Sequence, residues 1–241
     1  MSAAAADVAT IATRFLEAHA QGAAHRRGPR SITGCVTVSG QRFFCKTSEE
    51  SLANEAEALA ACRDLPGGAA YAVPLIGYDT DRNVLVTEPV DGGNLFNRLW
   101  NATDPWRLWE SPHRRFDWLF QQLARWLRAF HALHPGCTTP RKTPRAAIDH
   151  LLTMIDARLQ TVRTVGDAGL SEAQLDGVER LAHRLARSDT WTTQPMTLIH
   201  GDLTPVNILA ESDRSLVIID LGNVRHGFAL EDLARLWTSV W

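Results

Sequence analysis

A group of polar residues enclosed by short apolar runs, between positions 197 and 222, constrains this chain more than any other feature. Three runs rich in Ile, Leu and Val are predicted to be strands: 197–199, 208–210 and 216–219. His200, Asp202 and Asn207 follow the first run, and Asp220 follows the third. Strands that end next to one another would bring these side chains together, so the segment predicts a polar site built on strand ends.

The residue types in this segment suit the transfer of a phosphate from a nucleotide to a hydroxyl. Asp202 is the candidate catalytic base, which would orient the acceptor hydroxyl and accept its proton. The carboxylate of Asp220 and the amide oxygen of Asn207 are hard oxygen ligands that suit Mg²⁺. We expect His200 to hydrogen-bond the loop backbone rather than to carry protons.

The part of the chain before residue 91 alternates between β patterns and helical patterns. A short turn at Gly40-Gln41 indicates a hairpin, and Ser48 is a candidate cap for the helix that follows. The predicted elements are two helices, 7–20 and 49–63, a hairpin, 35–39 with 42–46, and two further strands, 74–78 and 84–87.

Asp91-Gly92-Gly93 separates this part from a mostly helical remainder. We therefore expect an N-terminal lobe of residues 1–90 and a C-terminal lobe of residues 91–241. Four helices are predicted in the second lobe from apolar residues at helical spacing: 114–134, 144–163, 171–188 and 229–238. The expected fold class is α+β, with a β-rich lobe that carries one main helix and a mostly helical lobe.

The sequence also resembles a known family. Residues 200–207 (His-Gly-Asp-Leu-Thr-Pro-Val-Asn), followed by a strand that ends in Asp220, are similar to the motifs of the aminoglycoside phosphotransferase and choline kinase-like branch of the protein-kinase-like fold. Protein kinases usually carry Arg where this chain has Gly201. Residues 127–133 and 231–234 resemble the sequences on either side of that catalytic loop. The resemblance implies a bilobal kinase-like fold that uses ATP and Mg²⁺.

The resemblance also assigns a role to Lys46, which closes a β-run where the family places the lysine that contacts the α- and β-phosphates. In the family a helical glutamate orients this lysine. Glu55 is our assignment, with Glu57 as the alternative. Residues two apart on a helix point in different directions, so only one of the two can face Lys46.

Residues 85–90 (Leu-Val-Thr-Glu-Pro-Val) resemble the hinge between the lobes of this family. The resemblance implies that the adenine of ATP hydrogen-bonds with backbone groups near Glu88 and Val90. Pro89 has no N–H, so Val90 is the natural donor. No Gly-rich loop precedes the β-run of the lysine, and residues 31–34 (Ser-Ile-Thr-Gly) are the candidate cover for the phosphates.

The expected function is transfer of the γ-phosphate of ATP to a hydroxyl of a small molecule, such as an antibiotic, a sugar or an amino alcohol. The alternative is a nucleotide-binding regulatory or scaffold module without efficient turnover, because the Gly-rich loop is absent and the sequence stops soon after Asp220. The presence of Lys46, Asp202 and Asn207 beside Asp220 favours the enzyme. We look to the segment 138–190, to a partner chain or to sequence beyond the C-terminus for the wall of the acceptor pocket.

Composition and charge agree with a globular chain, which we expect in the cytoplasm. The 241 residues are 45% hydrophobic and carry a net charge of −2, which gives no case for nucleic acid or an anionic membrane as partner. No stretch approaches the ~18 apolar residues of a membrane span, and the N-terminus lacks a signal-peptide pattern. The four cysteines form no C-x-x-C pair and are expected to be free thiols, although Cys35 and Cys45 lie where a hairpin can bring them face to face.

Overall fold

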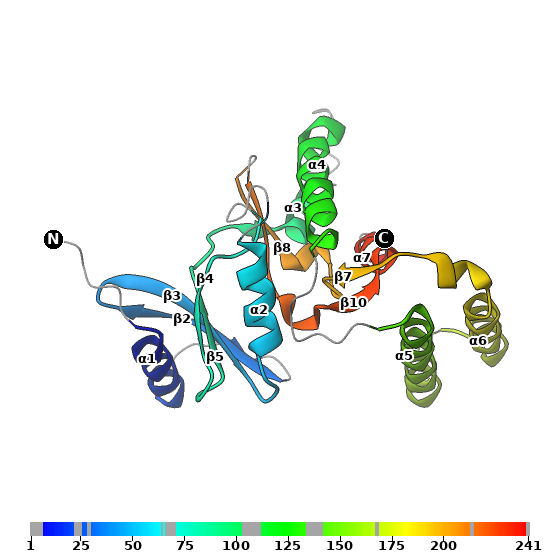
Figure 1. The fold of residues 1–241 in the computed structure, drawn as a ribbon, viewed down its shortest axis with the longest axis horizontal. Coiled ribbons are helices and arrows are strands. Elements are labelled where there is room, and N and C mark those ends of the chain that lie inside the picture. The colour runs from blue at the N-terminus through cyan, green and yellow to red at the C-terminus, as the bar shows by residue number, and fades with distance from the viewer. Residues whose placement is uncertain are drawn as a thin grey trace.

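The fold is described from a computed structural model of the 241-residue chain (Figure 1). The structure describes residues 7–21, 26–27, 30–63, 65, 71–102, 112–133, 142–166, 169–212 and 215–239. An antiparallel sheet near the N-terminus is followed by a mostly helical part, which confirms the predicted α+β class. Figure 1 shows the sheet with helices α1 and α2 at one end of the molecule, and helices α5 and α6 at the other end.

Five strands form the N-terminal sheet in the order β1-β2-β3-β5-β4, and all neighbouring pairs are antiparallel. The strands are β1 (Arg26–Arg27), β2 (Ser31–Val38), β3 (Gln41–Ser48), β4 (Leu75–Asp79) and β5 (Val84–Thr87). Ser39 and Gly40 make the turn between β2 and β3 with φ angles of 51° and 80°. Two positive φ angles are typical of the two-residue hairpin turn whose twist matches the strands. The predicted hairpin is therefore confirmed, with longer strands and a turn one residue earlier.

Helix α1 (Val8–Ala20) covers one face of this sheet, as predicted. Asp7 caps the helix by accepting a hydrogen bond from the backbone N–H of Thr10 at 2.9 Å. Ile11 and Phe15 are fully buried and pack against residues of β3 and β5: Phe43, Cys45, Val84 and Val86. Burial of such side chains stabilises the fold by about 1.5–3 kcal/mol each.

Helix α2 (Ala53–Cys62) covers the opposite face, but the predicted cap is wrong. Ser48 ends β3 because it pairs with Ser31 of β2, and the helix begins only after a turn of four residues. Leu52 takes the N-cap position, and its N–H donates to Oδ1 of Asn83 at 2.9 Å. Helix α2 therefore has no side-chain cap hydrogen bond, and Asn83 only anchors the residue that precedes the helix.

The register of the hairpin separates its two cysteines. Cys35 pairs with Phe44, and Cys45 pairs with Gly34, so the two thiols are not opposite each other. Cys35 is exposed, whereas Cys45 is buried in the core under α1. Both are free thiols, as is Cys62, and burial raises the pKa of Cys45 to about 12.

Two small sheets, five α-helices and three short 3₁₀ helices are the regular elements in the rest of the described chain. The sheets are β7 (Met196–Ile199) with β10 (Arg225–Phe228), and β6 (Gly93–Asn94) with β8 (Ile208–Ser212) and β9 (Ser215–Ile218). The helices are α3 (Leu95–Ala102), α4 (Pro112–His131), α5 (Pro144–Val165), α6 (Glu172–Ala186) and α7 (Ala229–Thr238). The predicted strands and helices of this part are confirmed with shifts of a few residues at their ends. We did not predict β6, α3 or β10, which are short and lack a long apolar pattern.

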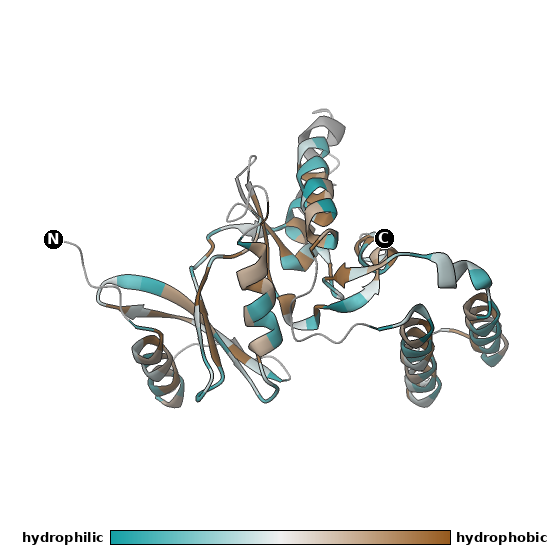
Figure 2. Ribbon diagram, in the orientation of Figure 1, coloured by the Kyte–Doolittle hydropathy of each residue, from teal (hydrophilic) through white to brown (hydrophobic). Residues whose placement is uncertain are grey.

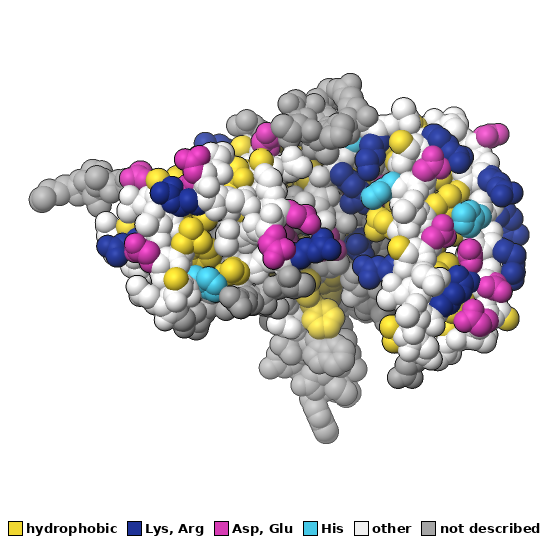
Figure 3. All heavy atoms as spheres, turned by 90° about the horizontal axis from the view of Figure 1, so that it is seen from below, with side chains coloured by type: hydrophobic (Ala, Val, Ile, Leu, Met, Phe, Trp, Pro, Cys, Tyr) yellow, Lys and Arg dark blue, Asp and Glu magenta, His cyan; other side chains and the backbone are white. Residues whose placement is uncertain are grey.

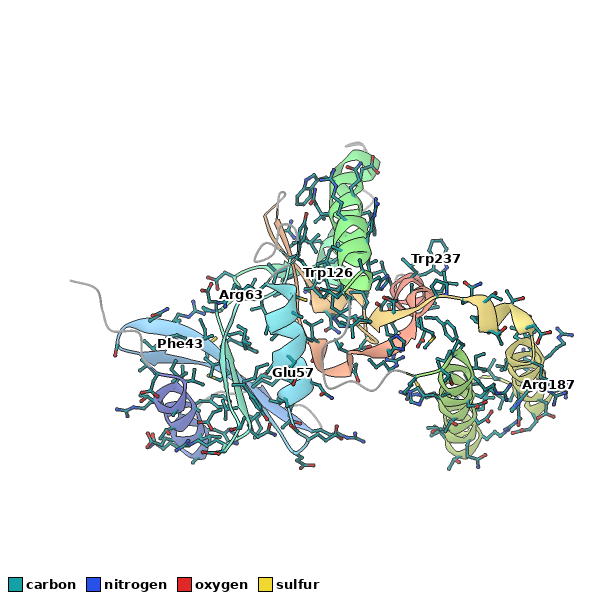
Figure 4. All side chains as sticks on the ribbon, viewed as in Figure 1. Phe43, Glu57, Arg63, Trp126, Arg187 and Trp237 are labelled. Atoms are coloured by element: carbon teal, nitrogen blue, oxygen red, sulfur yellow. The ribbon has the colours of Figure 1, made fainter. Side chains whose placement is uncertain are left out.

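One apolar core joins the two predicted lobes. It contains Leu59 of α2 and Leu85 of β5 together with Trp126 of α4, Leu198 of β7 and Ile218 of β9. Figure 2 shows apolar residues on the strands and helices that meet in the middle of the molecule, and Figure 4 places Trp126 near the inner end of α4. The lobe boundary at residues 91–93 stays a prediction, because packing is continuous across it.

Both ion pairs and apolar packing join α5 to α6, since Ala186 of α6 shares a buried cluster with Ala147 and Ile148 of α5. The guanidinium of Arg163 on α5 lies 2.8–3.3 Å from three carboxylates of α6, those of Glu172, Asp176 and Glu179. The N-terminal end of α5 is anchored differently, because Ala147 and Ile148 pack against Phe228 of β10. Among the described helices, none has the length and hydrophobicity needed to cross a membrane.

Candidate active site

Lys46 is the centre of a partly buried ion cluster between the sheet and the helical part. Its Nζ lies 2.8 Å from Oε2 of Glu55 and 2.7 Å from Oδ1 of Asp220. The Lys46 side chain is 15% exposed and that of Glu55 is 5% exposed. Burial alone would lower the pKa of Lys46, but the charges of Glu55 and Asp220 outweigh it and raise this pKa. The lysine is therefore held in its charged form at neutral pH.

Glu55, rather than Glu57, is the glutamate that meets Lys46, which confirms our assignment. Lys46 lies on the α2 face of β3, and Glu55 lies in the first turn of α2. Burial raises the pKa of Glu55, and the charge of Lys46 opposes that rise. Glu57 is two residues further along the helix and points elsewhere; Figure 4 labels it.

Asp220 reaches this cluster from the end of β9, which lies in the other half of the molecule. Its backbone is in the left-handed region, with φ 61° and ψ 60°, an unusual conformation for a residue with a side chain. A Cβ added to Gly222 would lie 3.2 Å from Oε2 of Glu55 and 3.7 Å from Nζ of Lys46. The missing side chain at Gly222 therefore lets the chain pass close to the three charges.

The loop after β7 carries Asp202 and Asn207, and a hydrogen bond joins them. Nδ2 of Asn207 donates to the backbone oxygen of Asp202 at 2.9 Å, and it lies 3.3 Å from Oδ2 of the same residue. Pro205 starts a short 3₁₀ turn (Pro205–Asn207), and the N–H of Ile219 donates to the backbone oxygen of Asn207 at 3.0 Å. This last bond sets Asn207 beside the strand that ends in Asp220.

His200 holds the backbone of the loop, as expected. Its side chain is fully buried, with Nε2 3.1 Å from the oxygen of Ile219, and its Nδ1 accepts from the N–H of Asp202 at 3.3 Å. This pattern requires the neutral imidazole with its proton on Nε2. Burial lowers the pKa of His200, against the raising effect of Asp232.

A buried carboxylate that we did not predict anchors the same loop. Asp232 of α7 is fully buried and accepts from the N–H of His200 and the N–H of Gly201, both at 2.9 Å. Nε2 of His131, at the end of α4, lies 3.0 Å from Oδ2 of Asp232. Both residues lie in the motifs that flank the catalytic loop in the sequence, but the sequence does not predict their contacts, which join segments far apart in the chain.

Arg225 fills the space beside Gly201. Gly201 has φ 77°, and a Cβ added there would collide with the guanidinium of Arg225 and the backbone oxygen of Asn223. Arg225 donates to Oε2 of Glu231 at 2.6 Å, and the other oxygen of Glu231 accepts from the N–H of Phe228. The glycine at the position where protein kinases carry Arg is thus explained by a nearby arginine from β10.

The predicted hinge leaves β5 next to the cluster. The N–H of Glu88 donates to the backbone oxygen of Pro74 at 3.0 Å, and Val90 packs against the shared core. Thr87, the last residue of β5, is 3% exposed, and its Oγ1 has no hydrogen-bond partner among the described residues. An unpartnered buried hydroxyl at this place fits a polar ligand such as a nucleotide base. Residues 31–34 begin β2 and are not a loop, so their role as a phosphate cover stays a prediction.

The structure thus brings the predicted residues of the catalytic loop, metal site and lysine cluster together. The roles assigned to these residues remain predictions: Asp202 in catalysis, Lys46, Glu55, Glu88 and Val90 in nucleotide binding, and Asn207 and Asp220 in metal binding.

The fold and the arrangement of charges define a kinase-like protein. The chain belongs to the phosphotransferase enzyme family, whose model matches residues 36–241. No curated protein sequence matches the chain significantly.

Solved structures of similar fold include several antibiotic phosphotransferases. A GDP complex of aminoglycoside 2'-phosphotransferase-IIIa is 17% identical with a TM-score of 0.63, and the match covers 97% of this chain and 79% of that one. A streptomycin–ATP complex of APH(2")-IIa is 13% identical with a TM-score of 0.56, over 96% of this chain and 75% of that one. Macrolide 2'-phosphotransferase MphH from Brachybacterium faecium is also 13% identical, with a TM-score of 0.56 over 95% and 76%. At such identities these similarities establish the kinase-like fold.

Proposed function

We propose that this chain transfers the γ-phosphate of ATP to a hydroxyl of a small molecule, with Mg²⁺ as cofactor. The observation that carries the proposal is the contact of Lys46 with both Glu55 and Asp220, next to the loop that holds Asp202 and Asn207. A phosphotransferase needs a cation for the phosphates, oxygen ligands for a metal and a carboxylate for the acceptor. The residues that we assign to these three roles lie on neighbouring segments, which supports the proposal.

The donor side of the reaction follows from these residues. Lys46, oriented by Glu55, would bind the α- and β-phosphates, and backbone groups at Glu88 and Val90 would bind the adenine. Asp220 and the amide oxygen of Asn207 would hold Mg²⁺, which when bound offsets the negative charge of the phosphates. The buried hydroxyl of Thr87 supports a nucleotide in the same place.

The acceptor side depends on Asp202, whose side chain is 32% exposed and therefore open to a ligand. Its carboxylate would accept a hydrogen bond from the acceptor hydroxyl and then take its proton. The names of the similar structures, which include complexes with streptomycin and with kanamycin and a macrolide phosphotransferase, support an antibiotic as one class of acceptor. We propose that the reaction takes place in the cytoplasm, where ATP is available. We also propose that the boundary between the two lobes lies at residues 91–93.

The test is an assay of phosphate transfer from ATP with Mg²⁺ and a panel of hydroxyl compounds: aminoglycosides, a macrolide, sugars and amino alcohols. Asp202→Asn should bind ATP with unchanged affinity and lose transfer by a factor of about 10²–10⁴. Asp220→Ala should weaken Mg²⁺-dependent nucleotide binding.

Exposed Asp149 gives the matched control, because Asp149→Asn removes a carboxylate that pairs with Arg145 on the surface of α5. This variant should transfer phosphate as the unmodified protein does. If the unmodified protein binds ATP and is as inactive as Asp202→Asn on every acceptor, the proposal fails and a nucleotide-binding module is the better description.

A further inference from the structure

We propose that Arg235 selects acceptors that carry an anionic group close to the hydroxyl that receives the phosphate. This inference rests on the proposed function, because it concerns the acceptor of the same reaction. Arg235 lies on α7, and its Nε is 3.5 Å from Oδ1 of Asp202, the candidate catalytic base. Any acceptor that reaches Asp202 therefore meets a guanidinium.

The two oxygens of Asp202 face different partners. Oδ2 lies 3.3 Å from Nδ2 of Asn207, on the side of the candidate metal site. Oδ1 faces Arg235. An acceptor hydroxyl that approaches the carboxylate from the side away from the metal ligands comes next to Oδ1, and the rest of the acceptor then lies within reach of the Arg235 side chain.

Arg235 has charge available for such a ligand. Its side chain is 44% exposed, and among the described residues Asp202 is the one carboxylate within ion-pair distance of it. A guanidinium carries five N–H donors in a planar fork that fits carboxylate and phosphate groups, so one contact to Asp202 leaves donors for a second anion. In contrast, Arg225 donates to Glu231 at 2.6 Å and is only 20% exposed.

Arg225 is a second basic side chain close to the catalytic loop, because its guanidinium lies beside Gly201. Burial lowers the pKa of His150 on α5, the charges of Lys142 and Arg225 lower it further, and the charge of Glu231 opposes this. Lys142 also places its backbone against the ring of His226 on β10. Figure 3 shows dark-blue side chains gathered on the lower face between the middle of the molecule and the α5–α6 helices.

Several carboxylates on α5 and α6 that could receive the ammonium groups of a polycation are already paired with arginine. Arg163 forms ion pairs with Glu172, Asp176 and Glu179, and Arg145 forms an ion pair with Asp149. A polycationic acceptor would thus bring positive charge close to the guanidinium of Arg235, where Asp202 is the one carboxylate within ion-pair distance among the described residues. An acceptor with a carboxylate or a phosphate group gains an ion pair at the same place.

The test compares four compounds of one skeleton that differ in charge: glucose, glucosamine, glucuronate and glucose 6-phosphate. Dissociation constants are measured by ligand-observed NMR with the full chain, and kanamycin is added as a polycation. We expect the two anionic sugars to bind about tenfold more tightly than glucose, and glucosamine to bind no better than glucose. The preference should shrink as ionic strength rises, because the pair is half-exposed.

Arg235→Gln should abolish the preference, whereas Arg235→Lys should keep part of it. Arg187→Gln is the matched control, because Arg187 is exposed at the far end of α6 (Figure 4), and it should leave the preference unchanged. Glucuronate and glucose 6-phosphate distinguish a carboxylate from a phosphate as the preferred anion.

The inference is overturned if neither anionic sugar binds, if kanamycin binds more tightly than they do, or if Arg235→Gln keeps the preference while folded by circular dichroism. Phosphate transfer is assayed separately. Anion preference without transfer to any compound would leave the inference standing and refute the proposed function. Phosphate transfer to kanamycin without any preference for the anionic sugars would refute this inference and support the proposed function.

Discussion

Nζ of Lys46 and Oδ1 of Asp220 lie 2.7 Å apart, although 174 residues separate them in the sequence. The lysine comes from the N-terminal sheet and the aspartate from the end of β9, so this ion pair joins the two halves of the molecule. Mg²⁺ and Lys46 would draw on the same carboxylate. Nucleotide binding should therefore depend on how firmly the second partner, Glu55, holds the lysine.

Glu55→Gln should weaken ATP binding about tenfold or more, because the amide no longer fixes the Lys46 ammonium in the direction of the phosphates. The dissociation constant for ATP with Mg²⁺, measured by calorimetry, checks this. Glu57→Gln is the matched control on the same helix and should change the constant little. Equal effects of the two substitutions would contradict the assigned role of Glu55.

Asp232→Ala should destabilise the protein by about 2–3 kcal/mol, because it leaves the buried N–H of His200 and the partly buried N–H of Gly201 without an acceptor. Urea denaturation gives the free energy of unfolding. Asp189→Ala, at an exposed position in the turn before β7, is the control and should change this free energy by less than about 0.5 kcal/mol. An Asp232→Ala variant as stable as the unmodified protein would refute the anchoring role.

Gly201→Ala should cost more stability than Gly166→Ala, although both glycines have positive φ, 77° and 71°. At Gly166 a Cβ has open space, so alanine there should lower the free energy of unfolding only by the cost of the left-handed backbone, about 1–2 kcal/mol. At Gly201 the Cβ also displaces Arg225 and the Asn223 backbone. Thermal denaturation of the two variants measures the difference in stability between them. Equal losses of stability would show that the loop can move to accommodate a Cβ at Gly201.

Acid should destabilise the fold through His200. Burial lowers the pKa of His200 in the folded state below its ordinary value of 6.5. Its contribution to stability is therefore fully present above pH 6.5 and is lost as the pH falls towards the folded-state pKa, by up to ~1.4 kcal/mol per pH unit.

The free energy of unfolding, measured between pH 7 and pH 5, should accordingly fall less steeply in His200→Gln than in the unmodified protein. His183→Gln removes a half-exposed histidine of α6 and should leave the slope unchanged. If His200→Gln shows the same pH dependence as the unmodified protein, the buried neutral histidine is not the cause.

Local patterns in the sequence predicted most of the fold. Apolar spacing predicted α1, α4, α5 and α6 to within a few residues, because each helix needs one apolar face. The pattern failed where a partner strand decides the structure. Arg225–Phe228 has little strand character of its own and becomes β10 because β7 pairs with it, and Ser48 stays in β3 for the same reason.

The sequence predicted some residues of the candidate site and not others, for a physical reason. Lys46, Asp202, Asn207 and Asp220 occupy positions that the family resemblance assigns, and the structure brings them together, while their roles stay predictions. The contacts of Asp232, His131 and Arg235 exist only once α4 and α7 pack against the loop. Spacing along the chain holds no information on such contacts.

The tight turn at Ser39 and Gly40 has a consequence for the chemistry several residues away. The turn fixes the register of β3 against β2. Side chains on a strand alternate between the two faces of the sheet, so the register decides which face each side chain occupies. A shift of the β2–β3 register by one residue would turn the thiol of Cys45 towards α2 in place of Lys46. It would also turn the ammonium of Lys46 into the apolar core under α1. A turn without any functional group of its own thus governs which side of the sheet can meet a nucleotide.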